Sequence, residues 1–265
     1  MSRGPVGIFD SGLGGLTVAR AIHRHLPHEN TIYFGDTARV PYGPKSPETV
    51  RRYSLEILHW LLGEGVKAVV VACNTSTAHA LEALAARSPV PVLGVIEPGA
   101  RAAVRISPHG PVGVIGTAGT VASGAYPRAL QALAPGVRVV QQACPLFVPL
   151  VEEGWFDHPA TDLVAREYLA PLLAEGIEAL VLGCTHYPLL APVLSGVAGP
   201  DVALVDSAEE TARALEALLR DRDLTAPVEP GPSHRYVVSD DPERFAAVAS
   251  RFLGERAGKA EVISW

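Results

Sequence analysis

Two stretches of the sequence repeat one pattern, VVVACNTSTA (Val69 to Ala78) and ALVLGCTHYPLL (Ala179 to Leu190). Each is an apolar run rich in branched residues that ends in a small residue, a cysteine and then polar residues. Such a run indicates a buried strand that turns into a helix at the cysteine, which places the thiol at the carboxyl edge of a sheet. Open α/β sheets bind their ligands at that edge. Two such edges, one per half of the chain, could face each other across one substrate.

Strand-like and helix-like runs alternate along nearly the whole chain, which predicts parallel sheets with helices on both faces. We expect strands at Val6–Phe9, Thr31–Phe34, Ala68–Val71, Val92–Val95, Val112–Ile115, Val137–Val140, Ala179–Leu182 and Val202–Val205. The helical spacing of apolar residues predicts helices over Thr49–Leu62, Asp162–Leu173 and Ala208–Leu219.

The repeat of the cysteine pattern predicts two similar lobes, because its period is too long for a solenoid. The segment Gly94–Ala100 contains Pro and Gly after a predicted strand and would carry the chain into the second lobe, while Asp206-Ser207 would bring it back. His234–Trp265 reads as strand, helix, strand and is expected to pack on the first lobe. The predicted fold is therefore α/β with the active site in the cleft between a first lobe (residues 1–97 and 207–265, carrying Cys73) and a second lobe (residues 98–206, carrying Cys184).

The composition limits the class of protein. Of 265 residues, 48% are hydrophobic, and the formal net charge is −6 with no basic block. A footprint for nucleic acid or for a basic membrane-surface segment is therefore absent. No apolar run reaches the roughly 18 residues that a membrane span needs, and the start MSRGPVGIFD lacks the apolar region of a signal peptide. We expect a cytoplasmic protein that binds neither nucleic acid nor membranes.

Cysteine and lysine are both rare in the chain. The cysteines are Cys73, Cys144 and Cys184, an odd and low number that is typical of free thiols in a reducing compartment. They lack C-x-x-C spacing, which makes a zinc site a poor interpretation. The lysines are Lys45, Lys67 and Lys259. None follows a site-forming motif, which disfavours pyridoxal phosphate because that cofactor needs a Schiff-base lysine. We predict no metal and no cofactor.

The first predicted strand runs into a Gly-rich turn, GIFDSGLGGLTV (Gly7 to Val18). Such a turn presents backbone N–H groups and a helix N-terminus to an anion. Gly12–Thr17 nearly matches a dinucleotide fingerprint, and Asp36 follows at about the right distance, but Thr17 stands where a third small residue is wanted. A site for a small carboxylate, or a tight strand-to-helix turn without a ligand, are the alternatives.

Polar residues follow each cysteine of the repeat. Asn74 and Thr75 could cap the helix after Cys73, or they could hold a carboxylate while the helix N-terminus lowers the pKa of the thiol. Cys184 repeats this arrangement and adds His186. A lone buried Cys is more often a small hydrophobe than a catalyst. Two of them at matching strand ends favour chemistry.

Two further stretches could contribute to a site. Cys144 lies in the apolar run CPLFVPLVEEG (Cys144 to Gly154), where we predict a structural role for the thiol. Glu152 and Glu153 in that run are either a solvated helix end or acids that support the site. The loop YFGDTARVPYG (Tyr33 to Gly43) follows a strand and is rich in Pro and Gly, which is typical of binding loops, although a flexible connector is the alternative.

Together these motifs resemble the glutamate racemases, of the cofactor-independent aspartate/glutamate racemase family. The motifs that carry the resemblance, in chain order, are Asp10-Ser11-Gly12, Pro41-Tyr42-Gly43, Cys73-Asn74-Thr75 and Cys184-Thr185-His186, and Gly113–Val121 and the Glu152 segment also fit. The resemblance covers nearly the whole chain. It implies an isomerase that interconverts L- and D-glutamate, supplies D-glutamate for peptidoglycan in cell wall biogenesis and cell shape, and forms a homodimer.

The resemblance also implies roles for single residues. Cys73 would take the proton from D-glutamate and Cys184 the proton from L-glutamate, and the assisting residues would be Asp10, Glu152 and His186. The residues implied to bind substrate are Asp10, Ser11, Tyr42, Gly43, Asn74, Thr75, Thr185 and His186.

Two thiols suit racemisation for a chemical reason. The Cα proton leaves from one face and a proton returns on the other, so one group must be thiolate while the other is thiol. An ordinary Cys has a pKa of about 8.5, and only a few per cent of it is thiolate near neutrality. Each thiol therefore needs a neighbour to tune it, and the resemblance pairs Asp10 with Cys73 and His186 with Cys184.

A thiolate alone cannot supply the rate. General base catalysis typically contributes about 10²–10⁴-fold, so the charge that develops on the α-carboxylate must also be stabilised. Asn74, Thr75 and Thr185 offer donors for it, and we expect a closed, dry cleft where such hydrogen bonds gain strength.

Three alternatives stay open from the residues alone. Aspartate, or acidic amino acids more broadly, would need only a different pocket shape. A regulator that binds a dinucleotide or small anion could use the same fold. A thiol–disulfide oxidoreductase would need two sulfurs in bonding distance, whereas a racemase must keep them apart.

Overall fold

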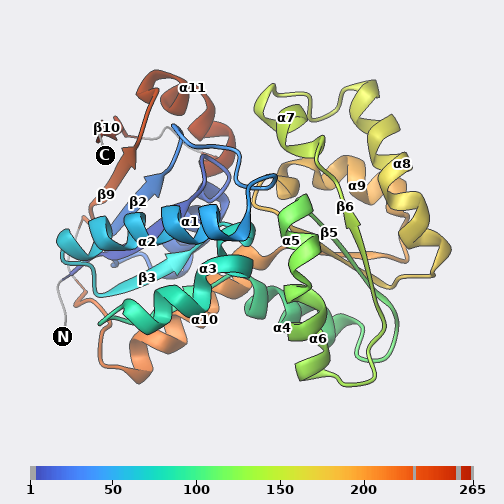
Figure 1. Ribbon diagram of the computed structural model, residues 1–265, viewed down its shortest axis with the longest axis horizontal. Helices are drawn as coiled ribbons and strands as arrows, with labels where there is room; N and C mark the ends of the chain where they lie inside the picture. Colours follow the sequence, from blue (N-terminus) through green and yellow to red (C-terminus); the bar gives the residue numbers. More distant parts are fainter. Residues whose placement is uncertain (1–3, 229–230, 255–257, 264–265) are drawn as a thin grey trace.

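The computed structural model describes residues 4–228, 231–254 and 258–263, which fold into two lobes lying side by side (Figure 1). Within these residues, the first lobe holds a six-stranded sheet in the order β10-β9-β2-β1-β3-β4, and the second holds a four-stranded sheet in the order β6-β5-β7-β8. All neighbouring strands are parallel. Helices flank both sheets, which confirms the predicted fold class.

The elements of both lobes follow in chain order. The first lobe contains β1 (Val6–Asp10), α1 (Leu16–His25), β2 (Thr31–Gly35), α2 (Pro47–Gly63), β3 (Ala68–Val71), α3 (Asn74–Arg87), β4 (Val92–Gly94), α10 (Ser207–Asp221), β9 (His234–Val238), α11 (Pro242–Leu253) and β10 (Glu261–Val262). The second lobe contains α4 (Ile96–Ile106), β5 (Val112–Gly116), α5 (Ala118–Ser123), α6 (Ala125–Leu133), β6 (Val139–Ala143), α7 (Phe147–Glu152), α8 (Pro159–Ala174), β7 (Ala179–Gly183), the 3-10 helix η1 (Tyr187–Leu190), α9 (Ala191–Ala198) and β8 (Ala203–Val205). Residues 255–257 and 264–265 of the predicted C-terminal strand–helix–strand lie outside the described residues.

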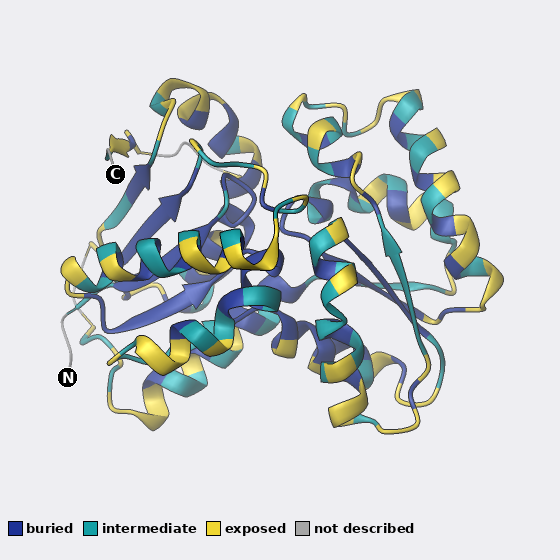
Figure 2. Ribbon diagram, viewed as in Figure 1, coloured by how far each residue is buried: buried dark blue, intermediate teal, exposed yellow. Residues whose placement is uncertain are grey.

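The central strands of each sheet are covered on both faces, so their sequences are continuous apolar runs rather than alternating ones. Every residue of β1, β2, β3, β5 and β7 is buried, and the outer faces of the helices carry the exposed residues (Figure 2). The edge strand β6 is only half-buried. Burial of β3 and β7 explains why the two cysteine stretches are so alike in sequence.

Strand register brings the functional stretches together at one edge of each sheet. Phe9 of β1 pairs with Val71 of β3, so Asp10 and Cys73 leave the first sheet from adjacent strands. In the second sheet Gly116 of β5 pairs with Gly183 of β7, and Cys184 follows directly. The carboxyl edges of both sheets therefore carry the polar residues.

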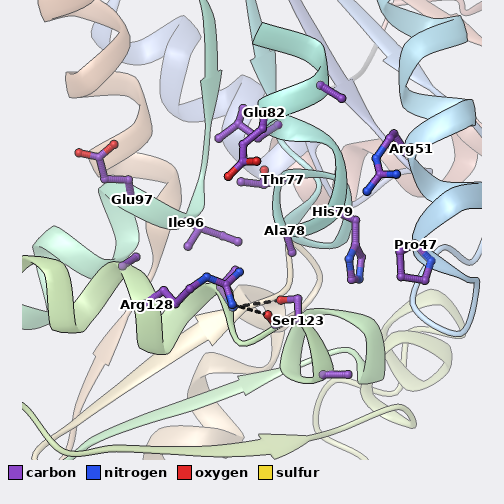
Figure 3. Close-up of a pocket in the computed structure, with 15 residues that line it drawn as sticks. Pro47, Arg51, Thr77, Ala78, His79, Glu82, Ile96, Glu97, Ser123 and Arg128 are labelled. Carbon is purple, nitrogen blue, oxygen red and sulfur yellow. Dashed lines mark hydrogen bonds between the residues drawn. The ribbon is translucent and has the colours of Figure 1, made fainter. Parts of the chain in front are cut away.

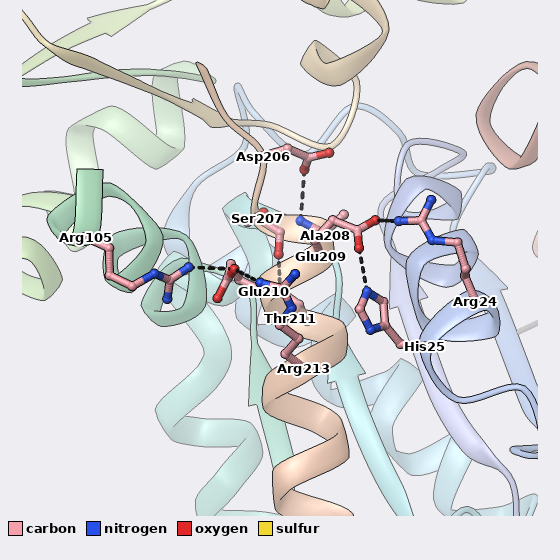
Figure 4. Close-up of polar contacts among 10 residues, drawn as sticks. All are labelled: Arg24, His25, Arg105, Asp206, Ser207, Ala208, Glu209, Glu210, Thr211 and Arg213. Atoms are coloured by element: carbon pink, nitrogen blue, oxygen red, sulfur yellow. Dashed lines mark hydrogen bonds and ion pairs between the residues drawn. The ribbon is translucent and has the colours of Figure 1, made fainter. Parts of the chain in front are cut away.

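The chain crosses between lobes at β4–α4 and at β8–α10. Helix α10 packs against α1 in the first lobe and against α4 in the second. Polar contacts follow both sides of α10: Glu209 binds Arg24 and His25 on α1, while Glu210 accepts from Arg105 on α4 at 2.7 Å (Figure 4). We propose that the lobes divide after residue 97, within the first turn of α4, and before residue 207.

Two predicted strands begin later than expected: β8 by one residue, at Ala203, and β6 by two. We expected Val137–Val140, whereas β6 starts at Val139. The N–H of Val137 donates to the carbonyl of Ala134 at 3.0 Å and closes a turn instead of joining the ladder. Its side chain is still buried, 4% exposed, so its apolar character reflects core packing before the strand starts.

Two observations concern features at a distance from the sheet edges. Among the described residues, no helix is both long and apolar enough to span a membrane. Lys67, just before β3, is buried and pairs with Glu29 at 2.5 Å. It therefore lies at the opposite end of β3 from Cys73.

Candidate active site

The two repeated cysteines come from opposite lobes into one buried region. Cys73 follows β3 and is 5% exposed, and Cys184 follows β7 and is 6% exposed. The lobes touch directly between them, because Thr185 Oγ1 donates to Asp10 Oδ1 at 3.4 Å and Thr17 Oγ1 donates to the Thr185 carbonyl at 3.4 Å. Their burial is what the expectation of a closed cleft requires.

The Gly-rich turn after β1 is packed against the second lobe. A Cβ at residue 14 would lie 2.2 Å from Thr185 Oγ1, so only glycine allows this approach. Asp36, fully buried, accepts from Arg39 Nε at 2.7 Å, from Ser239 Oγ at 2.8 Å and from the Tyr42 hydroxyl. The turn packs against Thr185 of the second lobe, and the Asp36 carboxylate already has hydrogen-bond partners within the protein. Both facts disfavour the dinucleotide interpretation.

Cys73 itself forms the N-cap of α3. Its sulfur accepts the N–H of Ser76 at 3.4 Å and donates to Ser11 Oγ at 3.6 Å. Burial, together with the charge of Asp10, outweighs these two contacts and raises the pKa of Cys73 to about 11. The Ser76 N–H at the helix N-terminus does lower this pKa, as predicted, but burial outweighs it and the net shift is upward. The interpretation that Asn74 or Thr75 caps the helix is wrong, because the cap is Cys73 itself. Unless something changes its surroundings, Cys73 is a thiol at neutral pH.

Cys184 has a cationic neighbour instead. His186 Nδ1 lies 3.9 Å from Cys184 Sγ, and its Nε2 donates to Glu152 Oε1 at 3.2 Å. Burial would lower the pKa of His186, but the contacts with Cys184 and Glu152, helped by Asp10, outweigh it and raise that pKa to about 10. The imidazole is therefore protonated at neutral pH and places a positive charge beside Cys184 Sγ.

Asp10 lies between the two cysteine environments. It accepts the N–H of Gly12 at 2.9 Å with one oxygen and the Thr185 hydroxyl with the other. Burial raises its pKa, against the opposing charge of His186 and these hydrogen bonds. A carboxyl group with a raised pKa can take and return a proton more readily than an ordinary one.

Donors that could hold a carboxylate line the same region. Asn74 Oδ1 accepts from the hydroxyl of Tyr126, in the second lobe, at 2.8 Å. Its Nδ2, in contrast, is buried and finds no acceptor among the residues that the structure describes. Thr75 Oγ1 lies 2.9 Å from Thr117 Oγ1 and 3.3 Å from Thr120 Oγ1 across the lobe boundary. An unpartnered buried donor is costly unless a ligand uses it.

Tyr42 and Gly43 lie at the rim of this region. The Tyr42 hydroxyl is spent on Asp36, and its buried ring packs in a small cluster with Cys73. The carbonyl of Gly43 accepts the N–H of Gly119 at 2.9 Å, which adds another contact between the lobes. Any contact of Tyr42 with a ligand must therefore come from its ring or main chain.

Cys144 follows an edge strand and lies in the core of the second lobe. It is fully buried, and its sulfur donates to the Gln142 carbonyl at 3.6 Å. Burial, and then the charge of Cys184, raise its pKa well above the ordinary value. These surroundings support the structural role predicted for it. All three cysteines are free.

Three cavities in the described residues lie between the lobes or beside Glu152. One of about 900 Å³ lies between α2 and α3 of the first lobe and α4, α5 and α6 of the second (Figure 3). Its lining includes Pro47, Arg51, His79, Ile96, Ser123 and Arg128 but no cysteine, so its size does not mark the chemistry. Two smaller ones, of about 350 and 210 Å³, share Glu152 in their walls. Val40 also lines both of them.

The structure gathers Asp10, Ser11, Cys73, Asn74, Thr75, Cys184, Thr185, His186 and Glu152 around the thiols. The sequence reasoning missed the partners that the opposite lobe supplies, above all Tyr126 and Thr117. Thr117 follows β5 and caps α5, the same strand-to-helix signal that identified Asn74, so it could have been found. Tyr126 carries no local signal.

Comparisons with known proteins agree with this geometry. Residues 16–215 match the Asp/Glu/Hydantoin racemase family. The chain belongs to this family, and it is an isomerase of the amino-acid racemase type.

The similar proteins cover almost the whole chain. A glutamate racemase from Geobacter metallireducens is 56% identical over 259 residues, which are 98% of this chain and 96% of that protein. The crystal structure of a glutamate racemase isoform from Bacillus anthracis is 40% identical with a TM-score of 0.96, covering 100% of this chain and 98% of that one. The glutamate racemase from Francisella tularensis, solved in complex with D-glutamate, is 35% identical with a TM-score of 0.93 at the same coverage.

Proposed function

We propose that this protein is a glutamate racemase that interconverts L- and D-glutamate with two thiols and no cofactor. The observation that carries the proposal is the pair of buried cysteines at matching strand ends of opposite lobes, joined across the boundary by the Thr185–Asp10 hydrogen bond. The similar glutamate racemases named above support the choice of substrate.

In the proposed reaction of L-glutamate, the Cys184 thiolate takes the Cα proton and Cys73 gives its S–H proton to the opposite face. The C–H electron pair passes to the α-carboxylate as an enediolate and returns to form the new C–H bond. The product is D-glutamate, with a thiol at Cys184 and a thiolate at Cys73. D-Glutamate is processed by the reverse sequence. The protonation states inferred above, a thiol at Cys73 and an imidazolium beside Cys184, suit the L-to-D direction directly.

The enzyme must then restore its starting protonation state. We propose that His186 and Asp10 carry out this step, because each adjoins one end and each has a raised pKa. Glu152 supports His186 because its Oε1 accepts a hydrogen bond from His186 Nε2 at 3.2 Å. With a pKa of about 11, the Cys73 thiolate left after the reaction is a strong base, which readily takes up a proton from a neighbouring acid or from solvent.

The substrate carboxylates need donors in this buried region. We propose that the free Nδ2 of Asn74 and the hydroxyl of Thr75 hold the α-carboxylate, where negative charge develops, and that the Thr185 hydroxyl joins them when it turns from Asp10 Oδ1 to the substrate. Ser11, Tyr42 and Gly43 would line the same pocket from the first lobe. Hydrogen bonds aimed at that charge inside a water-poor site are worth more than in solvent.

The wider role follows from the same proposal. A glutamate racemase supplies D-glutamate for peptidoglycan, and we propose that role here, with the enzyme acting in the cytoplasm as a homodimer. Aspartate, one methylene shorter, is the competing substrate. Turnover measured on both amino acids decides between them, and equal kcat/KM values would refute the proposed selectivity.

The two-thiol mechanism is tested by running each enantiomer in deuterated water. Early product should carry solvent deuterium while the residual substrate stays protiated, because the two faces use different groups. If recovered substrate gains deuterium as fast as product, a single base serves both faces and the mechanism is wrong. The Cys144→Ala variant is the matched control, since that thiol lies outside the proposed chemistry and the labelling pattern should be unchanged.

A further inference from the structure

The C-terminal helix of the first lobe reaches the acid/base group of the second. Arg244 on α11 places Nη2 at 3.6 Å from Glu152 Oε2, at the end of α7. Eight residues further along α11, the buried ring of Phe252 meets the His186 ring edge-on, with centroids 5.5 Å apart and planes at 82°. In Figure 1 the two helices face each other where the lobes meet. The imidazole and the carboxylate next to the second thiol are therefore contacted by the other lobe.

A continuous set of contacts leads from Arg244 to a proposed reacting atom. Arg244 contacts Oε2 of Glu152, Oε1 of Glu152 accepts from His186 Nε2 at 3.2 Å, and His186 Nδ1 lies 3.9 Å from Cys184 Sγ. Each carboxylate oxygen has its own partner, so the carboxylate is held at both ends. A carboxylate held in this way fixes the tilt and position of the imidazole it binds.

Arg244 is itself placed by the local backbone. Asp241 is the N-cap of α11, with φ at +49°, and its side chain accepts the N–H of Arg244 at 2.9 Å. Asp240, Asp241, Arg244 and Glu152 line the cavity of about 210 Å³ described above. The Arg244 side chain is 54% exposed, so its charge is partly screened by solvent. Its contribution is therefore modest and mainly one of orientation.

We propose that Arg244 is a positioning residue of the reaction: it holds the Glu152 carboxylate that keeps His186 aligned beside Cys184. This inference rests on the function proposed above. It makes the second thiol depend on the first lobe, so the relay at Cys184 is complete only when α11 and α7 are together. Arg244 touches neither thiol and acts only through Glu152.

The test is the rate at which iodoacetamide alkylates each cysteine, followed by peptide mass spectrometry on the full-length protein. In Arg244→Gln, the carboxylate loses one of its two partners, and we expect Cys184 to react about two- to fivefold more slowly, the range for an exposed ion pair. Cys73 and Cys144 serve as references in the same digest and should be unchanged. The kcat should fall by a similar factor, and Arg244→Lys, which keeps the charge, should restore most of both.

The matched control is Arg251→Gln. Arg251 lies on the same helix and faces the same lobe, with its guanidinium 5.9 Å from the Phe156 ring, but it does not contact Glu152. It should leave the Cys184-to-Cys73 ratio at its original value. If the ratio of the Cys184 and Cys73 alkylation rates is unchanged in Arg244→Gln, the inference is wrong. It is also wrong if all three cysteines change equally and the melting temperature falls, because the fold has then loosened as a whole. If glutamate fails to protect Cys73 and Cys184 in the unaltered protein, the proposed function fails and this inference with it.

Discussion

The two thiols occupy matching strand ends, yet their surroundings differ in charge. Cys73 faces the carboxyl group of Asp10 and the amide N–H of Ser76, whereas Cys184 faces the imidazolium of His186. The charge of Asp10 favours the protonated form of Cys73. A near-symmetric fold thus places an anion beside one thiol and a cation beside the other. A reaction with one proton donor and one acceptor needs that difference, because two identical thiols would share one protonation state.

The largest effect on activity is expected when either thiol is removed. Cys73→Ala and Cys184→Ala should each lower kcat by at least about 10²–10⁴-fold, the usual contribution of a general acid or base. Both directions should fail, since each direction uses one thiol as acid and the other as base. Racemisation is followed by circular dichroism from each enantiomer, with Cys144→Ala as the control. An active Cys184→Ala protein would refute the assignment of the second thiol.

Substitution of Asp10 or His186 tests the roles of Cys73 and Cys184 separately. We expect Asp10→Asn and His186→Asn each to lower kcat by about 10–10²-fold, less than loss of a thiol because the sulfur remains. His186→Asn should lower kcat more with L-glutamate, and Asp10→Asn more with D-glutamate. The equilibrium constant of a racemisation is one, so kcat/KM must fall equally in both directions and KM must compensate. Equal loss of kcat with both enantiomers in both variants would contradict the assignment of each neighbour to one end.

Much of this site could be predicted from local sequence. A short apolar run followed by polar residues predicts each strand that ends at Cys73 or Cys184. A buried parallel strand needs such an apolar run. What the sequence did not reveal depends on how the lobes approach. The contact of Tyr126 with Asn74 and that of Arg244 with Glu152 join residues far apart in the chain. The upward net shift in the pKa of Cys73 was missed for the same reason, since burial follows from tertiary packing and not from the helix start alone.

The pH dependence of alkylation tests whether Cys73 is protonated at neutral pH. A pKa of about 11 keeps Cys73 protonated through neutrality, so its reaction with iodoacetamide should rise about tenfold per pH unit and level off only near pH 11. An ordinary thiol levels off near its own pKa of about 8.5. Because the charge of Asp10 helps to raise the pKa of Cys73, Asp10→Asn should move this curve to lower pH. A plateau for Cys73 below pH 9 in the unaltered protein would show that the thiol is not held protonated.

The smallest expected effect concerns Tyr126, which tests whether the surroundings of Cys73 depend on the second lobe. Arg244→Gln tests the corresponding dependence of Cys184 on the first lobe. Tyr126 is fully buried and donates to Asn74 Oδ1 at 2.8 Å, which aims the free Nδ2 of that amide. Tyr126→Phe removes the donor and leaves the amide oxygen unpaired, a loss of about 1 kcal/mol of stability. It should lower kcat/KM about three- to tenfold, mainly through a higher KM, because the amide is less well oriented toward the substrate carboxylate. Tyr168→Phe is the control, since the Tyr168 hydroxyl contacts the Leu146 N–H at 3.4 Å within the second lobe. Denaturant unfolding and initial rates measure the two effects, and an unchanged KM in Tyr126→Phe would show that Asn74 is positioned by its own helix and not by the opposite lobe.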